Sequence, residues 1–159
     1  MVIFISGSIN SGKSTIAKLL SQKIDKPALV EIDVLSGFID WLPIEEKIQI
    51  NLENGAAVIN NFIRQGFNII VPYPLSKYNY DLLLSRLDLG GQSVHVFILN
   101  PELSVALSDR GGRELTEPER ARIRHHYDKK INDPGFGEVI DNSRQSAEES
   151  AADIFSRLR

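Results

Sequence analysis

The fold is decided by one stretch near the N-terminus, Val2-Ile3-Phe4-Ile5-Ser6-Gly7-Ser8-Ile9-Asn10-Ser11-Gly12-Lys13-Ser14-Thr15. Its apolar opening predicts a buried strand, and residues 7–15 have the spacing G-x-x-x-x-G-K-S/T that precedes a helix. Gly7 and Gly12 let consecutive backbone N–H groups converge on phosphate oxygens, and the helix adds its positive N-terminal end. The stretch therefore predicts a phosphate-binding loop (P-loop), with an ordinary glycine-rich turn as the alternative.

The side chains of this loop indicate which phosphates it would bind. Lys13 places a compact cation on β- and γ-phosphates, and the Ser14 hydroxyl suits a Mg²⁺ ion that bridges them. The chain has no N-K-x-D motif for reading guanine, which favours ATP over GTP. The loop residues predicted to bind the nucleotide are Gly7, Ser8, Ile9, Asn10, Ser11, Gly12, Lys13, Ser14 and Thr15.

Outside the loop, β-branched runs alternate with segments of helical period, which is typical of a parallel α/β fold. Helices are expected at 13–25, from Pro43 to Gly66, at 80–89 and at 101–110. Two more begin at the capping boxes that start with Thr116 and Ser146. No linker or repeat interrupts the chain, so we expect a single domain over 1–159. The expected strands are 2–5, 28–32, 68–71, 94–99 and 138–140.

Composition excludes several classes of protein. The 159 residues include 18 basic and 21 acidic side chains, for a net charge of −3, which argues against nucleic acid as the main partner. The absence of cysteine excludes disulfides, zinc ribbons and a thiol nucleophile. No apolar run approaches the length of a membrane span. We expect a cytoplasmic protein that is a monomer or a homodimer and does not bind membranes.

Two acidic residues stand at the end of the second expected strand. Alternation along a strand would put Glu31 and Asp33 on the same side, at the carboxyl edge where ligands of open α/β sheets bind. One of the two carboxylates could then support Mg²⁺, while the other takes the proton of an acceptor hydroxyl. The alternative is that Asp33 only caps the next helix.

A basic segment follows the fourth expected strand, and Gly111 and Gly112 interrupt it. A flexible joint beside clustered guanidinium groups suits a lid over 110–124 that excludes water from a triphosphate. The alternative is a solvated helix face with ion pairs between successive turns. The arginines of this segment are Arg110, Arg113, Arg120, Arg122 and Arg124.

These features together resemble the nucleoside-monophosphate-kinase-like branch of P-loop proteins, and within it the shikimate kinase, gluconate kinase and chloramphenicol phosphotransferase group. Glu31-x-Asp33 is similar to the D-x-D of shikimate kinases, and Asp33-Val34-Leu35 to the V-D-x-L that carries the proposed base of chloramphenicol phosphotransferase. Arg110 and Arg113 match lid arginines in placement. Ile140-Asp141-Asn142-Ser143 resembles a V-D-T-S turn near the adenine.

The resemblance implies a three-layer fold whose parallel five-stranded sheet has the order 2-3-1-4-5. It also implies that Arg110 and Asn142 belong to the nucleotide site. The chain departs from the family pattern at Val71-Pro72-Tyr73-Pro74, where nucleotide kinases have D-G-F/Y-P-R; this argues against a nucleoside monophosphate acceptor. Phe38, Trp41 and Tyr73 instead suggest an uncharged or aromatic acceptor, unless they only pack between helix and sheet.

The sequence therefore predicts an ATP-dependent, Mg²⁺-dependent phosphotransferase that acts on a hydroxyl of a small molecule. The expected catalytic residues are Lys13, Asp33, Arg110 and Arg113, and the expected metal ligands are Ser14 and Glu31. Asp33, Phe38, Trp41 and Tyr73 would contact the acceptor. The alternatives are a nucleotide or nucleoside kinase, and a non-catalytic ATP-binding module or slow NTPase.

Overall fold

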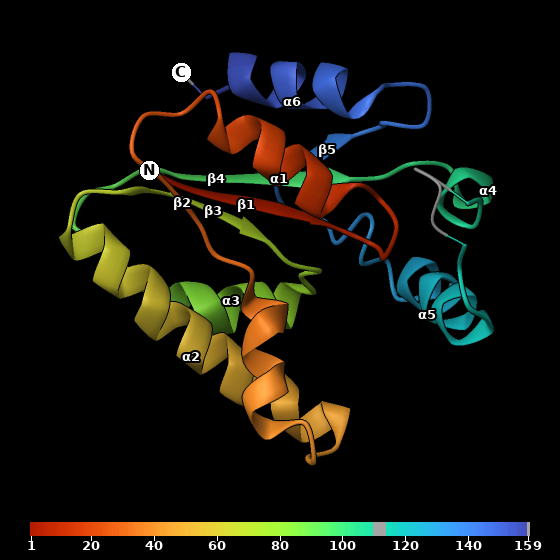
Figure 1. Cartoon of the computed structure of the whole chain (residues 1–159), viewed down its shortest axis with the longest axis horizontal. Helices are drawn as coiled ribbons and strands as arrows, with labels where there is room; N and C mark the ends of the chain where they lie inside the picture. The colour runs from red at the N-terminus through yellow and green to blue at the C-terminus, as the bar shows by residue number, and fades with distance from the viewer. Residues whose placement is uncertain (110–113, 159) are drawn as a thin grey trace.

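The computed structural model describes residues 1–109 and 114–158. At its centre is a five-stranded parallel sheet in the order β2-β3-β1-β4-β5, as predicted (Figure 1). Because β1 is the middle strand, the loop that follows it opens at the centre of the carboxyl edge. The strands are β1 (Val2–Gly7), β2 (Pro27–Leu29), β3 (Asn68–Pro72), β4 (Val94–Leu99) and β5 (Glu138–Ile140).

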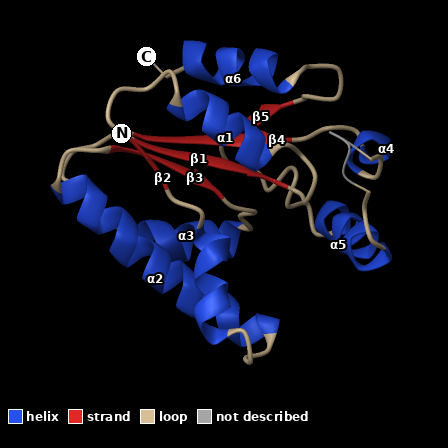
Figure 2. Cartoon of the chain, viewed as in Figure 1, coloured by secondary structure: helices blue, strands red, loops and turns tan. Residues whose placement is uncertain are grey.

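Helices cover both faces of the sheet, which gives the predicted three layers. In Figure 2, α1 and α6 lie on one face and α2 and α3 on the other, while α4 and α5 lie past the carboxyl ends of the strands. None of the helices in the described ranges is long and apolar enough to cross a membrane. The helices are α1 (Lys13–Ser21), the 3₁₀ helix η1 (Ile32–Ile39), α2 (Ile44–Arg64), α3 (Lys77–Ser85), α4 (Leu103–Ala106), α5 (Glu117–Asp128) and α6 (Ala147–Ser156).

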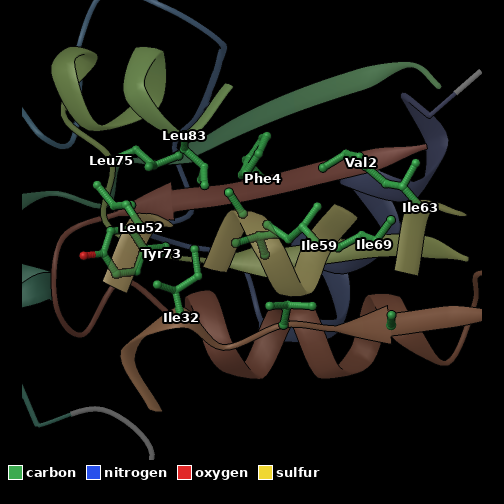
Figure 3. Close-up of a cluster of buried hydrophobic side chains, with 14 residues drawn as sticks. Val2, Phe4, Ile32, Leu52, Ile59, Ile63, Ile69, Tyr73, Leu75 and Leu83 are labelled. Atoms are coloured by element: carbon green, nitrogen blue, oxygen red, sulfur yellow. The ribbon is translucent and has the colours of Figure 1, made fainter. Parts of the chain in front are cut away.

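The central strand explains the two cores, because successive side chains point to opposite faces. Phe4 faces α2 and α3 and joins a buried cluster with Leu52, Ile59 and Leu83 (Figure 3). Ile3 and Ile5, on the other face, pack in a second cluster with residues of α1 and α6. All six residues of β1 are buried, as expected for a strand covered on both sides.

The second strand is shorter than predicted. β2 ends at Leu29, and Glu31 is the extended residue before η1, so the argument from strand alternation for Glu31 and Asp33 was wrong. The apolar pattern continues past the strand because Ile32 is fully buried beneath α2. At the contact, a Cβ on Gly55 would lie 2.9 Å from the Ile32 side chain, so only a glycine lets the helix approach this closely.

Other predicted boundaries shift by a few residues. The first helix ends at Ser21 rather than at 25, and the helix predicted over 101–110 covers only Leu103–Ala106. The third helix begins earlier than predicted because the Ser76 hydroxyl caps it by accepting a hydrogen bond from the Asn79 amide at 3.1 Å. Both predicted capping boxes are present, at the starts of α5 and α6.

The end of β1 requires glycine on two grounds. Gly7 has φ 137°, and a Cβ there would lie 2.5 Å from the Leu99 carbonyl oxygen. Gly7→Ala should therefore reduce the free energy of unfolding by at least about 2 kcal/mol, measured by urea denaturation. Gly37→Ala is the matched control, because a Cβ on Gly37 meets nothing within 4 Å. Equal stability of the two variants would contradict this account of the loop.

Candidate active site

The P-loop leaves β1 at Gly7 and enters α1 at Lys13, as its sequence predicted. Asn10 (φ 61°) and Gly12 (φ 97°) have left-handed backbone conformations, which turn the chain between β1 and α1. The Asn10 amide donates to the carbonyl oxygens of Ala106 and Ser108, each at 2.9 Å. The loop tip is thereby held to α4 and the residues after it.

A second asparagine holds the other side of the loop. The Asn142 Nδ2 donates to the Ser11 carbonyl oxygen at 2.9 Å, across 131 residues of sequence. Within the described residues, Ser11 Oγ and Asn142 Oδ1 are buried without a hydrogen-bond partner. Asn142 thus lies against the loop, and two buried polar atoms there make no hydrogen bond within the described residues.

Lys13 lies across the loop, where its Nζ donates to the Ser8 carbonyl oxygen at 2.6 Å. Burial lowers the pKa of Lys13 to about 8, and the Asp33 carboxylate opposes this change. The pKa of Asp33 is raised by burial and by Glu31, against the effect of Lys13. The structure therefore places Asp33 within electrostatic range of both Lys13 and Glu31, although not by the strand geometry that the sequence suggested.

Ser14 and Glu31, the predicted metal ligands, have oxygen atoms of the kind that Mg²⁺ binds. The Ser14 hydroxyl is exposed in the first turn of α1 and the Glu31 carboxylate is half-buried. Neither side chain makes a hydrogen bond or ion pair within the described part of the chain. No group of three or more His, Cys, Asp or Glu residues in that part could hold a metal alone. Mg²⁺ commonly takes one or two protein oxygens and completes its shell with water and phosphate, so these donors suit an ion that arrives with a nucleotide.

A cleft of about 630 Å³ opens beside Asp33. Its walls come from η1, α2, the segment after β3, and α5. Tyr73 is buried in one wall, and its pKa is raised to about 12 by burial and by Asp33, with Arg122 opposing the change. Asp33, Tyr73 and Arg122 therefore converge on the same space, which is large enough for a small molecule.

The predicted acceptor residues divide into two groups. Asp33 and Tyr73 line the cleft. Phe38 and Trp41 do not; their side chains are 83% and 81% exposed on and after η1, so packing between helix and sheet does not explain them either. Arg110 and Arg113, the predicted lid arginines, lie outside the described residues.

Sequence reasoning assigned the arginines of α5 to a lid but missed His126 on the same helix. The buried His126 places its Nδ1 3.3 Å from the Ser8 Oγ of the P-loop, and Arg122 lines the cleft one turn earlier. Burial, with smaller effects of the Arg122 and Lys13 charges, lowers the pKa of His126 to about 4, so the imidazole is neutral at neutral pH. A spacing of four residues puts Arg122 and His126 on one helix face, and this was the available signal.

No protein-family model matches the sequence, and no curated protein matches it. Solved structures match over 99% of the chain. The Deinococcus radiodurans tunicamycin resistance protein has a TM-score of 0.74 at 21% identity over 94% of its chain. The Mycobacterium tuberculosis APS kinase in complex with AMPPNP and APS has a TM-score of 0.71 at 18% identity, with 96% of its chain covered.

A gluconokinase from Sinorhizobium meliloti 1021 has a TM-score of 0.63 at 13% identity, with 97% of its chain covered. The sheet order and the helices on both of its faces are those of a P-loop kinase fold. The resemblance inferred from the P-loop and the acidic pair is therefore confirmed at the level of the fold.

The buried His126 should make stability depend on pH. Its pKa is about 4 when folded and about 6.5 when unfolded, so between these values the unfolded chain binds the additional proton. The free energy of unfolding should fall as the pH drops from 6.5 to 4, by up to about 3 kcal/mol from this group. Urea titrations of His126→Asn should show a correspondingly smaller fall over this range.

The neighbouring His125 provides the control, because its side chain is exposed and it contributes least among the groups that lower the pKa of His126. His125→Asn should therefore keep most of the wild-type pH dependence. The assignment to His126 is refuted when His126→Asn loses as much stability between pH 6.5 and 4 as the wild type.

Proposed function

We propose that this chain is an ATP-dependent, Mg²⁺-dependent phosphotransferase that moves the γ-phosphoryl group to a hydroxyl of a small molecule bound in the cleft. One observation carries the proposal. Asp33 lines the cleft and also lies within electrostatic range of Lys13 in the P-loop. A carboxylate shared by a phosphate-binding lysine and a cleft occupies the position that in-line transfer to a hydroxyl needs.

The reaction follows from these positions. The acceptor oxygen forms a bond to the γ-phosphorus while the bond from that phosphorus to the ADP oxygen breaks. The hydroxyl proton passes to the Asp33 carboxylate, whose raised pKa favours accepting it. Lys13 and the backbone N–H groups of the loop stabilise the charge on the phosphoryl oxygens.

Ser14 and Glu31 would hold the Mg²⁺ ion. When bound, the ion neutralises charge on the β- and γ-phosphate oxygens. Asn142 would border the nucleotide beside the loop, and Arg110 and Arg113 would close over the phosphates. The structures of similar fold support this reading, because they include an APS kinase in complex with AMPPNP and a gluconokinase.

Substitutions of Lys13 and Asp33 should affect different properties, namely nucleotide binding and turnover. Lys13→Ala should abolish the rise in melting temperature that Mg²⁺ and ATP produce, because the loop loses its cation. Asp33→Asn should keep that rise in melting temperature and reduce acceptor-dependent ADP release by at least about 100-fold, because no carboxylate is left to take the proton of the reacting hydroxyl. ADP release is measured with a coupled assay over a panel of small alcohols, sugars and hydroxy acids.

Two variants at exposed positions serve as controls. Lys18→Ala on α1 and Asp25→Asn before β2 remove the same charges away from the carboxyl edge and should behave as wild type. Normal turnover by Asp33→Asn would exclude it as the base. Nucleotide binding with no ADP release for any acceptor would instead favour a non-catalytic ATP-binding module.

A further inference from the structure

The 3₁₀ helix η1 carries apolar side chains that the described part of the chain does not cover. The helix follows β2 at the edge of the sheet and lies against α2 (Figure 1). Val34 and Phe38 on this helix are 65% and 83% exposed, and Trp41, just after it, is 81% exposed. Apolar side chains that gather on one exposed surface mark an interaction site. This face of η1 therefore needs a partner.

An apolar groove of about 360 Å³ opens beside these side chains. Its walls come from the end of β2, from η1 and from α2, and they include Val34, Leu35 and Phe62. Among the described residues that line it, Glu31 alone is charged. The groove is distinct from the cleft beside Asp33, and its size is sufficient for an aromatic ring. Because β2 is an edge strand of the described sheet, no further strand covers the groove.

The rings and the groove follow one another along η1 in an order that suits a second copy of the chain. Side chains three residues apart in a 3₁₀ helix lie nearly above one another, about 6 Å apart along the axis, so Leu35 in the groove and Phe38 share a face. Trp41 follows one turn later, where the Leu42 amide still donates to the Ile39 carbonyl oxygen at 3.0 Å. If two η1 helices pack antiparallel about a twofold axis at Phe38, Trp41 of each copy meets the groove of the other.

The charges of this face also suit a second copy. A charged side chain near a twofold axis would face its own copy and be repelled. Residues 34–39 carry no charge, and Asp40 is paired with Lys47 at 3.0 Å. A buried Trp41 needs an acceptor for its indole N–H, and the Glu31 carboxylate in the groove makes no hydrogen bond or ion pair within the described residues. Its two oxygens can accept this bond and still offer an oxygen to Mg²⁺.

The exposed area is of the size that a dimer contact requires. A buried aromatic side chain removes about 150–250 Å² from water, so Phe38 and Trp41 of two copies would together bury roughly 500–800 Å². A stable interface buries about 1,200–2,000 Å² in total. The two rings of each copy would thus supply a large part of the contact, and Val34 with the other groove walls would add to it.

We propose that this chain forms a homodimer in which the two η1 helices pack antiparallel and Trp41 of each copy enters the apolar groove of the other. The inference goes beyond the proposed phosphotransferase and does not depend on it. It gives Phe38 and Trp41 a role other than the acceptor contact that the sequence suggested. Because η1 also carries Asp33, the dimer would hold from outside the helix that places this carboxylate at the cleft.

Trp41 is the only tryptophan in the sequence, so tryptophan fluorescence reports on the proposed contact alone. The full chain is studied by sedimentation velocity and by fluorescence between about 0.1 μM and about 100 μM, which covers weak and stable dimers. The mass should rise with concentration from that of a monomer to that of a dimer. Over the same range, the Trp41 emission should move to shorter wavelength and its quenching by acrylamide should weaken, because the ring leaves water.

Variants assign the dimer to this face. Phe38→Ser should raise the dissociation constant of the dimer by at least about tenfold, because each copy loses a ring at the twofold axis. Tyr78→Ser is the matched control and should leave the constant unchanged, because Tyr78 is 71% exposed on α3 and does not line the groove. Circular dichroism melts at the lowest concentrations confirm that each variant is folded.

Two further variants separate the ring from the groove. Val34→Asp puts a charge in the groove wall and Trp41→Ala removes the ring, so each alone should dimerise at least about tenfold more weakly. An equimolar mixture should dimerise more tightly than either variant, because one intact ring then meets one intact groove. Since Trp41→Ala has no tryptophan, a shift of the emission in the mixture comes only from Trp41 of the Val34→Asp copy.

Other occupants of this face would give different results. The inference is overturned when the mass stays that of a monomer up to about 100 μM, when Phe38→Ser and Tyr78→Ser dimerise equally well, or when the mixture shows no rescue. A shift of the Trp41 emission at constant monomer mass on addition of ATP and Mg²⁺ would mean that the ring packs within its own chain. The same shift with vesicles of phosphatidylserine would assign the face to a membrane. Either result would overturn the inference.

Discussion

The P-loop backbone is the constraint on which the rest of the structure depends. Its turn from β1 into α1 requires left-handed backbone and a contact with Leu99 that admits no side chain at Gly7. Three distant elements then hold the loop, through hydrogen bonds from Asn10 to the α4 region, from Asn142 after β5, and between Ser8 and His126 of α5. These contacts are why α5, far along the chain, forms part of the cleft beside the loop.

The charges at the carboxyl edge suit a transfer reaction. Asp33 lies within electrostatic range of the loop cation Lys13 and lines the cleft, and Arg122 of α5 lines the same cleft. A triphosphate would meet Lys13, and a reacting hydroxyl in the cleft would meet Asp33. The net charge of −3 therefore conceals a local arrangement that suits a polyphosphate.

Local signals in the sequence were sufficient for the strands and the loop, because apolar runs, capping boxes and the glycine–lysine spacing each fix a short piece of backbone. The order of the strands was predicted only from the resemblance to P-loop kinases. The end of β2 was mispredicted because Ile32 is buried by α2 rather than by strand pairing. The cleft walls could not be predicted in this way. The burial of Asn51 and the meeting of His126 with Ser8, 118 residues earlier, depend on how distant helices pack.

The central claim is that the transferred phosphoryl group lies between the loop lysine and the cleft carboxylate. The most direct test is a crystal structure of the full chain with ADP, Mg²⁺ and tetrafluoroaluminate, which imitates a phosphoryl group in transit. The account predicts the fluoroaluminate within hydrogen-bond reach of Lys13 Nζ, with Asp33 on its open side facing the cleft. A fluoroaluminate bound away from Lys13, or separated from the cleft by protein, would contradict it.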